Sequence, residues 1–246
     1  MMIDMHTHIA WGIDDGLQTK DETIQALEHA KTQEIIGICL TPHVTPGITT
    51  QEEFQMILYR QKEVMELAKS LGVYIYSGCE MMMNIDFLDA LDQEMFQTLN
   101  ESKYLLIEFS YRTPLEALPY IDEYIQEIIC RGMVPVIAHV ERYFPSGLDI
   151  TRLEHWLDLG CLFQVNRSSI LGLHGKTLEK NAWDLLDHKW VHLVSSDAHR
   201  LEGSRVLQLD DVYKVLEKKI GLVNTKLLLE QNPYSILMNT ETKDME

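Results

Sequence analysis

The sequence predicts a single α/β domain, residues 1–246, in which parallel strands form a barrel. Short apolar runs alternate with long amphipathic segments throughout the chain, which is typical of β/α units around a parallel sheet or barrel. Seven of these runs qualify as strands. No low-complexity linker divides the chain, and an apolar content of 46% is enough for one large core.

Each predicted strand is a short apolar run that a longer amphipathic segment follows. The strands are expected at residues 2–6, 36–41, 73–77, 104–109, 134–138, 161–165 and 191–195. Helices are expected around residues 26–30, at 51–70, 114–131 and 151–159, and within 172–187. Two further helical segments flank Gly221, and the polar tail after Asn232 and Pro233 is expected to fray.

Charge and composition exclude several classes of partner. A net charge of −17 disfavours binding to a nucleic-acid backbone, which requires Lys and Arg, and also to an anionic membrane surface. No window holds 18 consecutive apolar residues, so no transmembrane helix is expected. The N-terminus carries Asp4 and two histidines where a signal peptide would have basic and apolar regions. We therefore expect a cytoplasmic protein without direct membrane insertion.

The four cysteines do not form a disulfide or metal motif. Cys39, Cys79, Cys130 and Cys161 lie far apart without a C-x-x-C pair, which is typical of buried thiols in an intracellular protein. The segment from Cys161 to Ser168 matches by count the C-x5-R-[ST] loop of cysteine-dependent phosphatases. That loop must cradle phosphate with its main-chain N–H groups, whereas the residues here are apolar, as in a buried strand. We therefore expect no cysteine nucleophile.

The N-terminal segment from Asp4 to His8 contains the first candidate metal ligands of the chain. Residues two apart on a strand point the same way, so Asp4, His6 and His8 are predicted to share one face. Two imidazoles one strand repeat apart can hold a single ion, and a nearby carboxylate can orient an imidazole. A lone His-x-His motif has little specificity, so the prediction of a metal site depends on the later strands.

Metal-ligand residue types recur at the ends of the predicted strands. In a β/α barrel these ends converge on one face, where active sites lie. The residues in these positions are His6, His8, His43, Glu80, Glu108, His139, Asp197 and His199. Each could be an ordinary polar strand terminus, but half of the ten histidines occur here beside three acids. The sequence therefore predicts a metal centre at one mouth of the barrel.

Several motifs are specific enough to identify a family. They are MIDMHTH (2–8), GIDDG (12–16), TPH (41–43), GCE (78–80), LIEFS (106–110), PVIAHVER (135–142), QVN (164–166) and SSDAH (195–199). With these motifs the chain resembles the PHP (polymerase and histidinol phosphatase) superfamily of metal-dependent phosphoesterases. Within that superfamily it is similar to the bacterial tyrosine-protein phosphatases of capsule and exopolysaccharide loci, the CpsB/YwqE type. The resemblance extends from the first strand to Asn232 and Pro233.

This resemblance implies a distorted (β/α)7 TIM-like barrel of the PHP type with three divalent metal ions. The implied ligand sets are His6, His8, Glu80 and Asp197 for the first ion, Glu80, Glu108 and His139 for the second, and Asp15, His43 and His199 for the third. Asp14 stays open as the alternative to Asp15. Many PHP proteins have histidine in place of Glu108, and this difference fits the tyrosine-phosphatase branch. The family often uses manganese, and a mixed set of nitrogen and oxygen ligands also suits iron or zinc.

The implied activity is the hydrolysis of phosphotyrosine, with a bacterial tyrosine autokinase of capsular or exopolysaccharide synthesis as the partner. Paired metal ions can activate a water molecule and clamp the phosphoryl oxygens, so that no phosphoenzyme forms. Tyrosine has a pKa of about 10, so its departure needs little help from a general acid.

Two arginines are predicted to bind the phosphoryl group. Arg142 follows His139 by three residues and could bind two phosphoryl oxygens with its planar guanidinium, the alternative being an ion pair with Glu141 or another surface acid. Arg205 follows the last ligand motif, where the family also places an arginine, and Arg200 is its alternative.

Two other functions remain open at this point. A small-molecule PHP phosphatase, such as a histidinol phosphatase, would use the same metal centre on a different substrate. A non-catalytic, metal-stabilised protein could instead dock on the kinase without hydrolysis. Turnover of a phosphotyrosine peptide and of histidinol phosphate, and phosphate release from the phosphorylated kinase, distinguish these functions. The sequence does not determine the oligomeric state.

Overall fold

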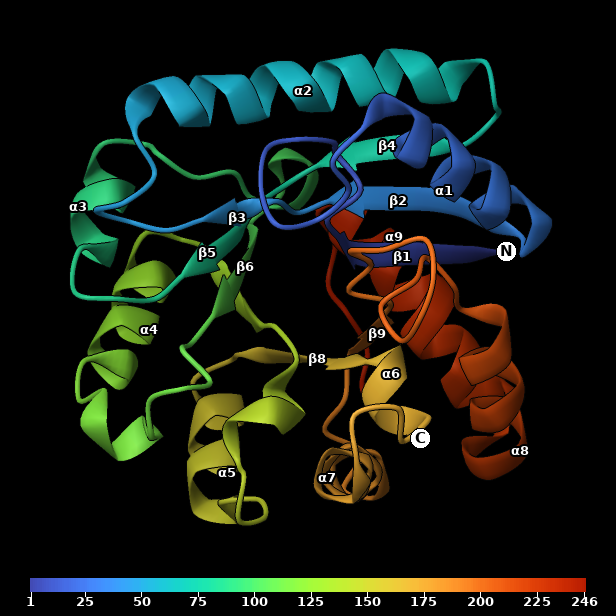
Figure 1. Ribbon diagram of the computed structural model, residues 1–246. Coiled ribbons are helices and arrows are strands. Elements are labelled where there is room, and N and C mark those ends of the chain that lie inside the picture. The colour runs from blue at the N-terminus through green and yellow to red at the C-terminus, as the bar shows by residue number, and fades with distance from the viewer.

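Nine parallel strand segments form the centre of the computed structural model, which describes residues 1–246 (Figure 1). They are β1 Met2–Thr7, β2 Ile35–Leu40, β3 His43–Val44, β4 Tyr74–Ser77, β5 Glu80–Met82, β6 Tyr104–Glu108, β7 Val134–Ile137, β8 Leu162–Asn166 and β9 Leu193–Ser195. Parallel pairing requires a crossover between successive strands, and the amphipathic segments of the chain supply these crossovers.

The strands pair in an order that curls into a distorted barrel. One group has the order β1-β2-β4, and the other has the order β3-β5-β6-β7-β8-β9. A parallel bridge between Thr7 and Ala198 links the segment after β9 to the end of β1. Because β3 and β5 directly continue β2 and β4 along the chain, the nine segments correspond to the seven predicted strands. The predicted distorted (β/α)7 architecture is therefore confirmed.

Two of the predicted strands are interrupted by a break in the pairing. At Gly78, an added Cβ would lie 2.9 Å from Leu99 Cδ2 and 3.2 Å from Cys39 Sγ, so a side chain there would force these neighbours to shift. At the other break, Pro42 has no N–H to donate to a neighbouring strand, but its carbonyl accepts the N–H of Glu80 at 3.0 Å. The breaks therefore separate β3 and β5 from the group of β1, β2 and β4, so that β5 pairs with β6 and β3 pairs with β5.

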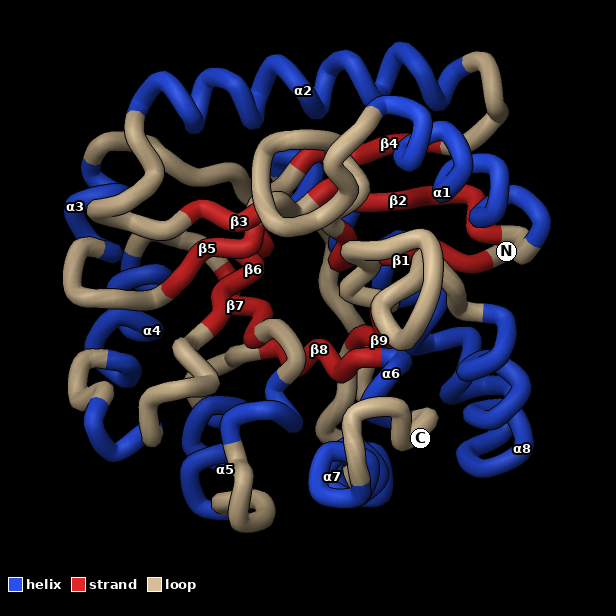
Figure 2. The backbone as a smooth tube through the Cα atoms, viewed as in Figure 1, coloured by secondary structure: helices blue, strands red, loops and turns tan.

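Helices cover the outside of the curled sheet (Figure 2). They are α1 Lys20–Thr32, α2 Gln51–Lys69, α3 Phe87–Asp92, α4 Ile121–Cys130, α5 Ile150–Asp158, α6 Arg167–Ile170, α7 Lys176–Asp187, α8 Asp210–Lys226 and α9 Asn232–Leu237. Gly221 interrupts α8 with a φ of 82°, as the prediction of two helical segments requires. None of the helices combines the length and the apolar character that a membrane span needs.

Local sequence explains where several helices begin. Thr19 and Thr50 each cap the following helix through a reciprocal pair of hydrogen bonds with the glutamate three residues later. The helix predicted at 114–131 is shorter than expected, because α4 begins only after Pro119. Proline lacks an N–H and disfavours helical backbone in the residue before it, so residues 115–117 form only a 3-10 turn.

Two apolar clusters pack on opposite sides of the strands. The larger cluster lies between the strands and the helices and includes Ile107 of β6. The smaller cluster fills the barrel interior and includes Tyr104 and Leu106 of β6 together with two residues of α9, which closes one end of the barrel. Side chains alternate along a strand, so Glu108 continues the inner row of Tyr104 and Leu106. That row ends at the open mouth of the barrel.

The C-terminal tail packs against the barrel, so the prediction that it frays is wrong. Asn232 donates to the carbonyl of Lys243 at 2.9 Å and accepts the N–H of the same residue at 2.8 Å. The N–H of Glu246 donates to Asn224 Oδ1 at 2.9 Å, and Met245 is buried. The tail is polar in sequence, but asparagine side chains from the preceding helices provide the hydrogen bonds that hold it.

His192, directly before β9, is a buried histidine in its neutral form. Its Nδ1 accepts a hydrogen bond from the N–H of Phe163 at 3.1 Å, which requires that nitrogen to be unprotonated. Burial lowers the pKa of His192 to about 4, against the opposing effect of Asp244. The unfolded residue takes up a proton near pH 6.5, so this contribution to stability is lost as the pH falls from about 6.5 towards 4.

We expect His192→Asn to flatten the acid-induced fall in stability over this pH range. Asparagine can accept the same hydrogen bond and has no proton-binding site, so the pH-dependent loss should shrink by up to about 3 kcal/mol. Urea unfolding at several pH values between 4 and 7 measures this difference. His188→Asn, at an exposed position, is the control. Parallel pH profiles for wild type and His192→Asn would contradict the assignment.

Candidate metal centre

The predicted ligand residues lie together at the open end of the barrel. They are His6, His8, Asp15, His43, Glu80, Glu108, His139, Asp197 and His199. Each stands at or beyond the end of β1, β2, β4, β6, β7 or β9, so the convergence of parallel strands brings them together. Only Asp15 has a largely exposed side chain, at 62%, so the cluster is buried except at one rim.

Glu80 occupies the centre of this cluster. Its Oε2 lies 3.2 Å from the Nε2 atoms of both His6 and His8, and 3.1 Å from His43 Nδ1. Its Oε1 lies 2.9 Å from His139 Nε2. Although three imidazoles surround Oε2, this buried oxygen has no hydrogen-bond partner. An unpartnered carboxylate oxygen is costly to bury, and a bound cation would satisfy it.

Four overlapping groups of side chains could each hold a metal ion. The groups are His8, Asp15, His43 and His199; His6, Glu80 and His139; His6, His8 and Asp197; and His43, Glu80 and Glu108. Within each group the ligand atoms lie within 4.8 Å of one another. Glu108 is nearer to His43, at 3.1 Å, than to His139, at 3.8 Å, although the family resemblance pairs it with His139.

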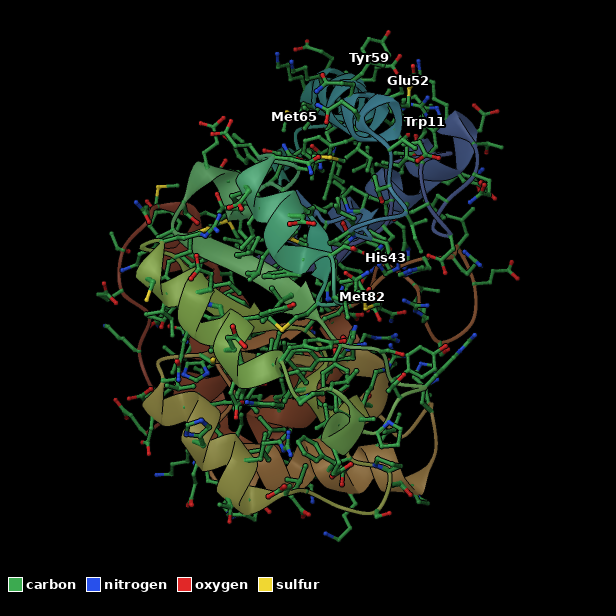
Figure 3. All side chains as sticks on the ribbon, turned by 90° about the vertical axis from the view of Figure 1, so that its left-hand side faces the viewer. Trp11, His43, Glu52, Tyr59, Met65 and Met82 are labelled. Carbon is green, nitrogen blue, oxygen red and sulfur yellow. The ribbon has the colours of Figure 1, made fainter.

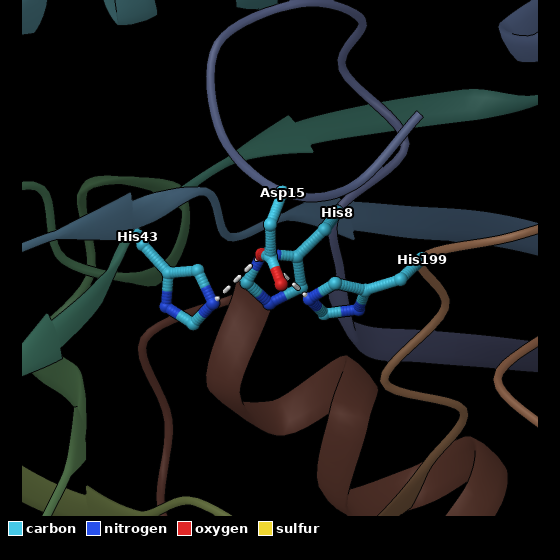
Figure 4. A group of neighbouring side chains, drawn as sticks. All are labelled: His8, Asp15, His43 and His199. Carbon is cyan, nitrogen blue, oxygen red and sulfur yellow. Dashed lines mark ion pairs between the residues drawn. The ribbon is translucent and has the colours of Figure 1, made fainter. Parts of the chain in front are cut away.

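Asp15 lies at the rim of the cluster between two histidines (Figure 4). Its Oδ1 is 3.2 Å from His199 Nε2 and 3.3 Å from His43 Nε2, and hydrogen bonding to these imidazoles holds the pKa of Asp15 well below its usual value. Asp14 instead lies behind His8 and accepts its Nδ1–H at 2.8 Å. Of these two adjacent acids, Asp15 therefore faces the other candidate ligands, and Asp14 orients an imidazole.

The loop between β1 and α1, which carries both acids, is held from three sides. A Cβ on Gly16 would lie 2.0 Å from the carbonyl oxygen of His8, so only glycine allows this close approach. Arg60 of α2 lies 4.4 Å from the centre of the Trp11 ring and donates to the Trp11 carbonyl. Figure 3 shows Trp11 beside α2. Arg200 donates to the Gly16 carbonyl at 3.1 Å from the opposite side.

His6 and His199 are held, like His8, through Nδ1, so that Nε2 faces the other candidate ligands. His6 Nδ1 donates to Gln164 Oε1 at 3.0 Å, and His199 Nδ1 donates to the carbonyl of Asp197 at 3.0 Å. A neutral imidazole with a proton on Nδ1 has its lone pair on Nε2. In all three histidines Nε2 faces the cluster, the orientation in which an unprotonated imidazole ligates a metal ion, and Arg205 Nη2 lies 2.9 Å from the Nε2 of His199.

Asp4 does not orient an imidazole, so the expectation that this carboxylate supports His6 or His8 is wrong. Its Oδ1 accepts the main-chain N–H groups of Ser196 at 3.1 Å and of His6 at 3.4 Å. The pairing of β1 with β2 is irregular between Asp4 and Thr7, so the strict alternation behind the prediction does not hold there. Burial raises the pKa of Asp4 to about 6. Asp4 therefore ties β1 to the segment that follows β9.

Two candidate ligands have left-handed backbone conformations. His139 follows β7 with a φ of 33°, and Asp197 lies just beyond β9 with a φ of 53°. Such conformations are costly for residues with a side chain and cluster at functional sites. The ring of His139 is fixed further by Tyr143, whose hydroxyl lies 3.2 Å from Nδ1 and accepts the N–H of Phe109 at 3.0 Å.

The charges in the cluster shift one another's protonation strongly. Burial acts to lower the pKa of His6, but the carboxylates of Glu80 and Asp197 outweigh it and raise that pKa to about 9. Burial also acts to lower the pKa of His43, but nearby carboxylates, Glu80 above all, raise it well above its usual value. Burial acts to raise the pKa of Glu80, yet the two imidazoles hold it well below its usual value. Protons or cations must therefore balance the buried carboxylates, and a divalent ion can do so.

The predicted arginines border the cluster at Asp197. Arg142 Nη1 lies 3.3 Å from Asp197 Oδ2, and Arg205 Nη2 lies 2.7 Å from Asp197 Oδ1. Arg200 instead donates to main-chain carbonyls of the loop before α1. Glu141, the other partner considered for Arg142, accepts a hydrogen bond from a serine hydroxyl. The structure therefore places Arg142 and Arg205 next to the candidate ligands.

Sequence reasoning did not identify the polar residues that support the ligands from behind. Gln164 accepts His6 Nδ1–H and, at 2.8 Å, the main-chain N–H of His139. Its amide donates to Asn166 Oδ1 at 2.8 Å, and Asn166 donates to Asp197 Oδ2 at 2.8 Å. This chain of hydrogen bonds fixes the orientation of both amides. The motif QVN at the end of a strand was the available signal, because its first and third residues share a face.

Comparison with known proteins agrees with this geometry. The family model described as "Capsular polysaccharide synthesis, CpsB/CapC" matches residues 2–238. The chain belongs to the CpsB/CapC family. The family predicted from the motifs is therefore confirmed.

Several members of the family, and one more distant protein, are informative. The chain is 33% identical over 245 residues to the tyrosine-protein phosphatase CpsB of Streptococcus pneumoniae, covering 97% of this chain and 99% of that protein. It is 28% identical to the tyrosine-protein phosphatase YwqE of Bacillus subtilis, covering 98% of this chain and 90% of that protein. A putative histidinol phosphatase of Listeria monocytogenes shares only the fold, with a TM-score of 0.53 at 12% identity over 80% of this chain and 94% of that one.

A solved structure matches nearly the whole chain. It comes from the crystal structures of YwqE and CpsB, described as unique metal-dependent tyrosine phosphatases. The TM-score is 0.87 at 27% identity, over 99% of this chain and 97% of the matched chain. The predicted tyrosine-phosphatase activity and metal dependence agree with these CpsB/CapC relatives.

Cys161 is not placed as a nucleophile in this member of the CpsB/CapC family. Its thiol is buried, and burial raises its pKa to about 12, so the reactive thiolate is strongly disfavoured. Arg167, at the other end of the candidate loop, pairs with Asp211 at 2.8 Å. The intervening residues form β8 instead of a phosphate-binding loop.

We expect Gln164→Leu to weaken metal binding by roughly 10- to 100-fold, the usual cost of losing a residue that orients a ligand. Leucine has a similar size but cannot accept the proton of His6 Nδ1. Titration of metal-free protein with Mn²⁺ against a competing chelator measures the affinity. Gln25→Leu, on the exposed face of α1, is the matched control. An unchanged affinity in folded Gln164→Leu would show that Gln164 does not orient a ligand.

Proposed function

We propose that this chain acts as one catalytic domain, residues 1–246, and is a metal-dependent protein-tyrosine phosphatase, a phosphoric monoester hydrolase. The observation that carries the proposal is the cluster of five imidazoles and four carboxylates with Arg142 and Arg205 at its edge. A phosphate monoester is an anion, so its hydrolysis needs positive charge around the phosphoryl oxygens and an activated nucleophile. This cluster can provide both.

We propose that the cluster holds three divalent ions, which are manganese, with iron or zinc as alternatives. The proposed sets are His6, His8, Glu80 and Asp197; Glu80, Glu108 and His139; and Asp15, His43 and His199. The unpartnered Oε2 of Glu80 and the Nε2 atoms of three histidines, which face the cluster, support this assignment. Mixed nitrogen and oxygen ligands suit these metals better than Ca²⁺ or Mg²⁺.

The ions, when bound, would activate a water molecule and neutralise phosphoryl charge, so that no phosphoenzyme is needed. Arg142 and Arg205 bind the remaining phosphoryl oxygens, because a guanidinium is permanently charged and presents two parallel N–H groups. Asp197 holds both guanidinium groups in position, one on each of its carboxylate oxygens. The side chains thereby preorganise positive charge where the transferred group will lie.

We propose a bacterial tyrosine autokinase of capsular or exopolysaccharide synthesis as the substrate protein. The family to which the chain belongs, described by its role in capsular polysaccharide synthesis, supports this choice, as do relatives named tyrosine-protein phosphatases. We also propose a cytoplasmic location, which agrees with four unpaired cysteines.

A small-molecule phosphatase is the main alternative. A histidinol phosphatase would use the same kind of centre, and the putative histidinol phosphatase of L. monocytogenes shares this fold. A non-catalytic protein that docks on the kinase is the second alternative. Its difficulty is that it assigns no role to Arg142 and Arg205 beside the cluster.

We expect phosphotyrosine peptides to be hydrolysed at least about tenfold more efficiently than histidinol phosphate, in kcat/KM. Chelation should abolish this activity, and Mn²⁺ or a similar ion should restore it, because the buried carboxylates need a cation. Phosphate release is measured for both substrates before and after metal removal. A preference for histidinol phosphate would favour the small-molecule phosphatase. Full activity in metal-free protein would refute the metal-dependent mechanism.

We expect His139→Ala and Arg142→Ala to differ in metal content, although both should lose turnover. His139→Ala removes a proposed ligand, so the variant should lose bound metal and turnover together. Arg142→Ala should keep the metal content and lose roughly 10²–10³ in kcat, the usual cost of one preorganised electrostatic donor. Arg142→Lys should recover little, because lysine lacks the planar fork. Elemental analysis and kcat are measured for each folded variant, and wild-type turnover in Arg142→Ala would exclude its role at the phosphoryl group.

A further inference from the structure

A pocket lies beside the candidate metal centre. It has a volume of about 350 Å³ and is lined by Tyr111, Arg142, His174, Leu178 and Arg205. Tyr111 follows β6. His174 lies two residues before α7, and Leu178 lies in the first turn of that helix. Because the two arginines also contact Asp197, the pocket begins where the proposed phosphoryl group would be bound.

The lining of this pocket combines cationic and apolar side chains. Arg142 and Arg205 supply positive charge, and the apolar lining consists of the ring of Tyr111 and the aliphatic side chain of Leu178. Tyr111 is 63% exposed, so this wall is open to a substrate that arrives from solvent. A phosphate ester bound by the arginines would extend its organic group between these walls. Flat and aliphatic surfaces bind an aromatic ring favourably.

His174 lines the same pocket, and its covered ring nitrogen has no hydrogen-bond partner. Its Nε2 is covered from solvent and is unpaired. Burial, together with Arg142 and Arg205, lowers the pKa of His174, so the ring is neutral at physiological pH and carries one N–H donor. A covered nitrogen that pairs with nothing costs stability, and a bound ligand can supply the missing partner.

We propose, building on the phosphatase function above, that Tyr111, His174 and Leu178 form the aryl pocket for the phosphotyrosine side chain. Within it, the His174 N–H donates to the ester oxygen that joins the ring to phosphorus. Water adds to phosphorus, the bond from phosphorus to this oxygen breaks, and its electron pair stays on the oxygen as a phenolate. His174 stabilises that negative charge by its hydrogen bond and keeps its proton, and the phenolate takes a proton from solvent afterwards.

The test compares two leaving groups in the metal-loaded enzyme. Phenyl phosphate releases a phenolate about as basic as that of tyrosine, with a pKa of about 10, whereas p-nitrophenyl phosphate releases a much weaker base. We expect His174→Phe to lower kcat for phenyl phosphate by about 10²-fold and kcat for p-nitrophenyl phosphate by only a few-fold. His174→Asn retains an N–H donor and should recover part of the loss on phenyl phosphate.

Controls separate this role from a structural one. Metal content and the circular dichroism spectrum are measured for every variant, and His29→Phe, at an exposed position on α1, is the matched control. If His174→Phe lowers kcat equally on both substrates, or lowers it on neither, the proposed hydrogen bond to the leaving oxygen is wrong. Leu178→Ala tests the aryl wall independently and should raise KM for phenyl phosphate with little change in kcat. An unchanged KM would show that Leu178 does not contact the aryl ring of the substrate.

These outcomes are distinguishable from failure of the proposed phosphatase function. If the wild-type enzyme turns over histidinol phosphate and neither aryl phosphates nor phosphotyrosine peptides, the phosphatase assignment is wrong. If wild type hydrolyses aryl phosphates and the variants at His174 and Leu178 match it, only the aryl pocket is wrong.

Discussion

The burial of several carboxylates at one mouth of a parallel barrel is the constraint on which this structure depends. Glu80 is fully buried, and three imidazoles from the ends of two other strands surround its Oε2 without bonding to it. A charge in this position is tolerated only with compensating charge nearby. The fold supplies that compensation from imidazoles and two guanidinium groups, and it leaves a ligand environment suited to divalent cations.

Much of the backbone irregularity in this protein serves to place these side chains. The break at Gly78 starts the new segment that carries Glu80, and the break at Pro42 does the same for His43. His139 and Asp197 have left-handed conformations directly beyond their strands. A regular strand would alternate its side chains between the barrel interior and the helices. Local departures from that alternation let neighbouring strands present ligands to one point.

A layer of uncharged polar residues gives the centre its geometry. Gln164 links His6 to the main chain of His139, Asn166 extends the network to Asp197, and Tyr143 supports the ring of His139. Residues that orient ligands in this way determine which imidazole nitrogen is available to a metal. The chain belongs to the CpsB/CapC family, whose relatives include proteins named tyrosine-protein phosphatases. The pocket beside the candidate metal centre is the site that we propose for the aromatic ring of the substrate.

The sequence by itself determined the barrel, because alternating apolar runs and amphipathic segments depend on local periodicity. It also identified the candidate ligands, since residues such as His43 and Glu108 stand at strand ends that a barrel must bring together. Contacts between distant segments were decided only by the tertiary structure. The role of Asp14 behind His8, the docking of the tail by Asn232 and the false prediction for Asp4 all depend on such contacts. Periodicity shows which face a side chain occupies, but only packing selects its partner.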